Sequence, residues 1–70
     1  MAFKLTDRGD QVACNPTAKM TPMDRKVVGF MYTARIPVEL EEIMDDTSMS
    51  DEGCVIVMKR LVGEGYVEET

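Results

Sequence analysis

Side chains that could carry out covalent or acid–base chemistry are few and far apart in this sequence. There is no histidine, and the two cysteines, Cys14 and Cys54, are 40 positions apart. Enzymes commonly place a nucleophile beside a base, and a cysteine–histidine zinc site needs several such ligands. We therefore expect neither an enzyme nor a zinc site. Cys54 is expected to be a small apolar core residue and Cys14 an incidental thiol, with a redox switch joining them as an alternative.

Carboxylates are the most abundant chemically active groups, and two pairs of them stand close together. Asp45-Asp46 and Asp51-Glu52 could attract a divalent cation. Their spacing lacks the alternating ligands and the central glycine of a calcium-binding loop. We therefore expect a solvated acidic face in this region, with no metal and no cofactor.

Charge is divided unevenly along the chain, whose formal net charge is −5. Residues 1–35 carry a net charge of +3, whereas residues 36–70 carry a net charge of −8. Segregation of this kind bears on partners and assembly more than on fold. The basic side chains of the first half are expected to form a solvated face, with a contact to phosphate or to the acidic half of another chain as alternatives.

Length and hydropathy indicate one small soluble domain. The chain has 70 residues, and a core of this size rarely supplies more than roughly 3–5 kcal/mol, so self-association is expected to supplement it. Charges interrupt the N-terminal residues where a secretory signal would be apolar, and the longest apolar run, Cys54–Met58, is five residues. We therefore expect a cytoplasmic protein with no membrane contact.

The first twenty residues are predicted to form a short strand and a loop. Phe3-Lys4-Leu5 alternates apolar and polar residues, and Thr6 can cap a turn or a brief helix after it. Asn15-Pro16-Thr17 then indicates an exposed turn.

A helix is predicted to begin at Pro22 with Thr21 as its N-cap. Its apolar residues recur at helical spacing and are expected to be buried, while Asp24 and Arg25 are expected to face away from them. This apolar stripe consists of Met23, Val27, Phe30, Met31 and Ala34.

Two further helices and a strand complete the predicted core. The second helix should begin near Pro37 and end at residues 47–49, and the third should be capped by Ser50 and run to Gly63. Gly65 offers the left-handed conformation that lets the chain leave this helix for a strand at residues 66–69. The side chains expected to be buried are Leu40, Ile43 and Met44 on the second helix and Cys54, Met58, Leu61 and Val62 on the third.

The order of these residues resembles the core of winged helix-turn-helix regulators. In that family a serine caps the recognition helix, the residue four positions later packs against the preceding helix, and a glycine leads into the first wing strand. With residues 27–31 as the supporting first helix, the resemblance covers about 50 residues. The matching residues are Pro37 to Ile43, Ser50, Cys54, Met58, Leu61 and Gly65-Tyr66-Val67.

In that family a second wing strand accompanies the first, and Phe3 to Gly9 resembles it. We therefore predict that this N-terminal segment pairs antiparallel with residues 66–69, with Arg35-Ile36 as a third strand. A partly ordered N-terminal arm is the alternative.

The predicted fold is mainly α with a small antiparallel β-sheet. It is a single, permuted winged-helix-like domain over residues 1–70, with three core helices and a short wing formed by the N- and C-terminal strands. Residues 1–20 are expected to form the wing strand or arm and a loop, and residues 21–70 the helical core and C-terminal strand.

The resemblance implies DNA binding, with the third helix in the major groove. The residues at the outward positions of this helix disfavour DNA binding. They are two acids, Asp51 and Glu52, and two apolar residues, Val55 and Ile56. Seven acids, at positions 39, 41, 42, 45, 46, 51 and 52, crowd the face that would lie along the DNA backbone. Duplex affinity comes largely from neutralising phosphates, so repulsion is expected there.

We therefore predict an interaction module that acts by protein contact in transcription regulation or a related assembly, as a homodimer or beside a larger partner. The predicted protein interface consists of Met49, Asp51, Glu52, Val55 and Ile56.

The alternative function is that of a dimeric DNA-binding transcriptional regulator. In that case Lys4 and Arg8 of the N-terminal strand region, together with Lys59 and Arg60 of the third helix, would contact the DNA phosphates.

Overall fold

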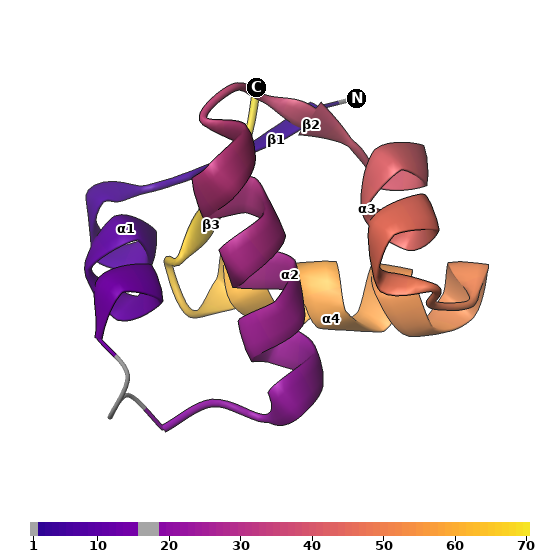
Figure 1. Cartoon of the computed structure of the whole chain (residues 1–70), viewed down its shortest axis with the longest axis horizontal. Coiled ribbons are helices and arrows are strands. Elements are labelled where there is room, and N and C mark those ends of the chain that lie inside the picture. Colours follow the sequence, from indigo (N-terminus) through magenta and orange to yellow (C-terminus); the bar gives the residue numbers. More distant parts are fainter. Residues whose placement is uncertain (1, 16–18) are drawn as a thin grey trace.

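The computed structural model describes residues 2–15 and 19–70, and within these ranges it contains four helices and one three-stranded sheet (Figure 1). Helix α2 contacts both α1 and α3, which lie on opposite sides of it, and α4 packs against α2 and α3. In chain order the elements are β1 (Ala2–Leu5), α1 (Asp7–Cys14), α2 (Pro22–Ala34), β2 (Val38–Glu39), α3 (Leu40–Thr47), α4 (Asp51–Gly63) and β3 (Val67–Glu69). None of these helices is long and apolar enough to cross a membrane.

The sheet joins the two ends of the chain. Its strand order is β2-β1-β3, and both pairings are antiparallel. Strand β1 aligns Phe3 with Glu69 and Leu5 with Val67, which confirms the predicted pairing of the N-terminal segment with the C-terminal strand. Phe3 and Val67 are buried, so the sheet presents one face to the helices.

The third strand lies later in the chain than the sequence predicts. Arg35 is the C-cap of α2 in the left-handed conformation, with φ 61°, and Ile36 is 65% exposed. Neither residue is part of a strand. Pairing with β1 begins only after Pro37, at Val38. The next helix consequently begins at Leu40 and not near Pro37. Its start is closed by a capping box, in which the backbone N–H of the N-cap residue Glu39 donates to Glu42.

The segment after β1 is a complete helix, α1, which brings the number of helices in the described residues to four where three core helices were predicted. Thr6 is its N-cap and accepts a hydrogen bond from the backbone N–H of Gly9, at 3.1 Å. Thr6 also fixes this helix to the far end of the chain, because its backbone N–H donates to the carbonyl oxygen of Tyr66 and its hydroxyl donates to that of Gly65. The turn predicted at Asn15-Pro16-Thr17 falls largely outside the described residues.

Helix α2 buries part of the predicted stripe, because Val27 and Met31 are buried and Phe30 and Ala34 are half-buried and pack against the core. Thr21 caps the helix as expected, but Met23 is 43% exposed, and Asp24, expected to face solvent, is buried. The buried stripe runs through Asp24, Val27, Val28 and Met31. The reason is a tertiary contact, because the guanidinium of Arg60 on α4 forms an ion pair with the carboxylate of Asp24.

Helix α4 is capped by Ser50 as predicted, with the backbone N–H of Gly53 donating to its hydroxyl. The buried residues are Cys54, Val57, Met58 and Leu61, whereas Val62 is 38% exposed, contrary to the sequence prediction. Valines occupy both flanks of this helix, so apolar character alone does not distinguish the buried flank from the exposed one. Gly65 leaves the helix with φ 83°, as predicted.

Candidate interaction surface

The outer face of α4 is the side of the helix turned away from the core. Buried residues recur at positions 54, 57, 58 and 61, so the residues half a turn away from them point outward. Glu52, Ile56 and Lys59 are exposed there, and Val55 is half-buried at the margin. Ile56 is 63% exposed, which makes it one of the two most exposed large apolar side chains in the described residues.

Acidic side chains dominate the start of this face. Asp51 and Glu52 occupy the first turn of α4, where the positive end of the helix dipole favours negative charge. Both are exposed, as are the five other acids of the predicted acidic face, at positions 39, 41, 42, 45 and 46. The acids of α3 and α4 therefore lie on the surface, as predicted from the sequence.

An apolar hollow of about 250 Å³ adjoins the outer face of α4. Val55, Lys59 and Val62 form its α4 side, and Phe3 and Leu40 face them from β1 and α3. Met58 and Glu69 complete its lining. Val62, which is exposed contrary to the sequence prediction, therefore contributes to this hollow.

Met49, the remaining residue of the predicted interface, lies in the turn before α4. It is half-buried and packs against the core. The structure therefore brings Glu52, Val55 and Ile56 together on the outer face of α4, whereas Met49 packs against the core.

Three of the four cations proposed for DNA contact have partners within the chain. The Lys4 ammonium lies 3.3 Å from a carboxylate oxygen of Glu68, and the Arg8 guanidinium lies 5.0 Å from the centroid of the Tyr66 ring. Arg60 is paired with Asp24. Lys59 is exposed and forms no ion pair with residues 2–15 or 19–70. The four cations come from three elements, with Lys4 on β1, Arg8 on α1, and Lys59 and Arg60 on α4.

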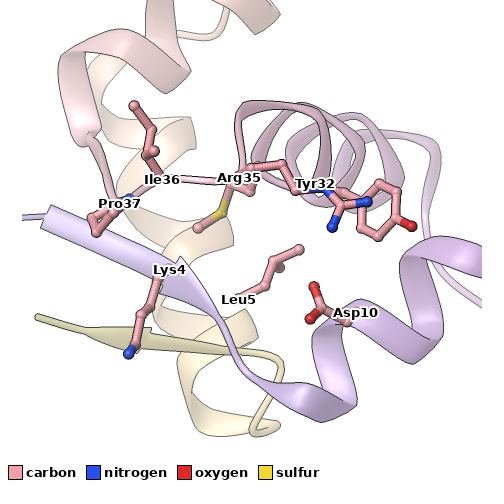
Figure 2. A pocket seen from close by; sticks show the side chains of 8 residues that line it. Lys4, Leu5, Asp10, Tyr32, Arg35, Ile36 and Pro37 are labelled. Atoms are coloured by element: carbon pink, nitrogen blue, oxygen red, sulfur yellow. The ribbon is translucent and has the colours of Figure 1, made fainter.

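A second hollow, also of about 250 Å³, lies on α1, α2 and β1 (Figure 2). The Arg35 guanidinium lies 4.5 Å from the centroid of the Tyr32 ring, and Ile36 points away from that ring. The Cys14 sulfur and the Tyr32 hydroxyl oxygen form a hydrogen bond of 3.0 Å, and this bond with Cys14 is the main cause that raises the pKa of Tyr32. The bond between Cys14 and Tyr32 joins the end of α1 to the last turns of α2.

The two cysteines lie in different environments, and both are free thiols. Cys14 is exposed, whereas Cys54 is fully buried, as the sequence predicts for a core residue. Burial, with a smaller contribution from the charge of Asp51, raises the pKa of the Cys54 thiol and keeps it protonated at neutral pH. Across residues 2–15 and 19–70, no three histidine, cysteine or acidic side chains are grouped so that they could hold a metal ion.

Comparisons with known proteins identify no relative of this chain. No protein-family model matches the chain, and no significant match was found among curated proteins or solved structures.

Proposed function

We propose that this protein is a non-enzymatic interaction module that binds another protein through the outer face of α4. The observation that carries the proposal is the position of Ile56, which is 63% exposed on that face and is followed around the helix by Val55, a lining residue of an apolar hollow. An exposed apolar surface with a polar rim is typical of a protein contact.

The order of elements supports a permuted winged helix as the fold of this module. Strand β2 lies between α2 and α3, β3 follows α4, and β1 lies between the two other strands in the sheet. In the winged helix-turn-helix regulators that residues 37–67 resemble, α4 would correspond to the recognition helix. This resemblance is the basis for proposing a role in transcription regulation or a related assembly.

Charge supports a protein partner over a DNA duplex. A helix in the major groove runs between two phosphate backbones, and affinity for them comes from lysine and arginine. Here exposed Asp51 and Glu52 occupy the N-terminal turn of α4, the part that would approach the bases, and four exposed acids lie on α3 beside it. Lys59 is the one cation of the proposed DNA set that has no partner in the described residues.

A titration with DNA tests this proposal without knowledge of the partner. A labelled random-sequence duplex is titrated with the protein at low salt, and binding is followed by fluorescence anisotropy. Sequence-blind binders have dissociation constants of about 10⁻⁴ to 10⁻⁶ M at physiological salt and bind tighter at low salt. We expect no binding up to about 10⁻⁴ M protein, a concentration that suffices for even the weakest of these binders.

The contradicting result is salt-sensitive binding of the duplex. The variant Lys59→Glu then locates it, because loss of binding in this variant would assign the DNA contact to α4. Arg60 stays unchanged in this experiment, because its removal would leave the carboxylate of Asp24 without its ion pair.

A further inference from the structure

The residues on the outer face of α4 are self-complementary about a point between Val55 and Ile56. Three positions before Val55 stands Glu52, and three positions after Ile56 stands Lys59. Apolar residues thus occupy the centre, with a negative charge on one side and a positive charge on the other. All four residues lie outside the buried stripe of the helix.

Glu52 and Lys59 are too far apart to form an ion pair with each other within one chain. Seven residues of α-helix separate Glu52 from Lys59, which is a rise of about 10.5 Å at about 1.5 Å per residue. Neither side chain forms an ion pair with other described residues. Both charges therefore remain available to a partner on this face.

We infer that the protein forms a two-fold symmetric homodimer in which the outer faces of two α4 helices pack antiparallel. This inference rests on the proposed function and names its partner as a second copy of the chain. A two-fold axis between Val55 and Ile56 places Glu52 of each copy beside Lys59 of the other, and it places the four apolar side chains between these two ion pairs. Two-fold dimers, which use the same patch on both subunits, are the commonest oligomers.

Other arrangements of two copies match charge less well. A parallel pairing of the same two faces would set Glu52 against Glu52 and Lys59 against Lys59. The hollow in Figure 2 carries the other highly exposed isoleucine, Ile36, and its charged lining residues are Lys4, Asp10 and Arg35. Lys4 is already paired with Glu68 and Arg35 lies over the Tyr32 ring, so neither cation is as available to a second copy as Lys59 is.

The available area predicts a weak dimer. Standard interfaces bury roughly 1,200–2,000 Å² in total, or about 800 Å² from each partner. The whole chain exposes 4484 Å², and the proposed contact consists of one helix face and the rim of the adjoining hollow. We therefore expect an interface at or below the small end of this range, with a dissociation constant in the micromolar range.

Reversal of one charge at a time tests the antiparallel pairing of the two α4 helices. The variant Glu52→Lys carries lysine at both positions, and Lys59→Glu carries glutamate at both, so each would face like charges in its own homodimer. In an equimolar mixture, each copy of one variant meets opposite charges on the other. Sedimentation velocity at several protein concentrations measures dimerisation of the wild type, each variant and the mixture.

We expect the wild type to dimerise, each variant alone to dimerise at least about tenfold more weakly, and the mixture to recover the affinity of the wild type. Both substituted positions are exposed, and circular dichroism checks that each variant is folded. The inference is overturned if the wild type is monomeric, if the variants dimerise as tightly as the wild type, or if the mixture stays monomeric.

The failure of this inference differs from the failure of the proposed function. A wild type that is monomeric and does not bind the duplex overturns the homodimer and leaves the outer face of α4 to a different protein. Salt-sensitive duplex binding overturns the proposed function itself.

Discussion

The variant Gly9→Ala is expected to lose about 3 kcal/mol or more of its free energy of unfolding, because overpacking against backbone is costly. A Cβ atom at Gly9 would lie 2.1 Å from the carbonyl oxygen of Tyr66. That oxygen also accepts the hydrogen bond from the backbone N–H of Thr6, so α1 cannot move away without loss of this contact. Urea denaturation followed by far-ultraviolet circular dichroism measures the change.

Gly29→Ala is the matched control for Gly9→Ala. Gly29 lies within α2, and a Cβ there would meet nothing within 4 Å. Alanine is a better helix former than glycine, so this variant is expected to gain about 0.5–1 kcal/mol. Equal stability of Gly9→Ala and the wild type would contradict the close packing of α1 against the turn before β3.

The variant Arg60→Met is expected to lose on the order of 3 kcal/mol, because it leaves a buried carboxylate without its partner. The Asp24 side chain is only 8% exposed, whereas that of Arg60 is 42% exposed. Methionine keeps much of the apolar stem of arginine and removes the guanidinium. Since a core of this size supplies roughly 3–5 kcal/mol, most of the stability would be lost.

Two variants separate the ion pair from other effects of that substitution. Lys59→Met removes the neighbouring cation, which has no ion pair in the described residues, and it should change stability by less than about 0.5 kcal/mol. The double variant Arg60→Met/Asp24→Leu removes both charges and should recover most of the loss. If Arg60→Met and Lys59→Met proved equally stable at low protein concentration, the ion pair between Arg60 and Asp24 would not contribute to the stability of the fold.

Signals that act within a few residues were predictable from the sequence. Thr6, Thr21 and Ser50 were each predicted to cap a helix or turn, and each accepts a hydrogen bond from the N–H three residues later. The pairing of β1 with β3 was also predicted, but through a resemblance between segments and not through local chemistry.

Features that depend on distant contacts were not predictable in the same way. The carboxylate of Asp24 is buried because Arg60, 36 positions later, neutralises it, and no pattern within α2 carries that information. The close approach of Gly9 to Tyr66 likewise depends on how α1 docks on the end of the chain. The sequence alone gives no sign that Gly9 is buried.

The candidate interaction surface was predictable in part. Helical spacing was enough to turn Ile56 away from the core, and the structure places it on the surface. The hollow beside it was not foreseen, because it depends on the exposure of Val62 and on the positions of Phe3 and Leu40. On α4, where apolar residues occupy most positions, sequence spacing alone did not distinguish Val57 from Val62.

Self-association of two matched isoleucine variants tests the interaction surface most directly. Ile56→Lys and Ile36→Lys introduce the same charge at side chains of nearly equal exposure, 63% and 65%, but only Ile56 lies on the outer face of α4. Sedimentation velocity over a range of micromolar concentrations compares both with the wild type. We predict that the wild type and Ile36→Lys dimerise equally and that folded Ile56→Lys stays monomeric. Dimerisation of Ile56→Lys with the affinity of the wild type, or a wild type that is itself monomeric, would contradict a homodimer formed through α4.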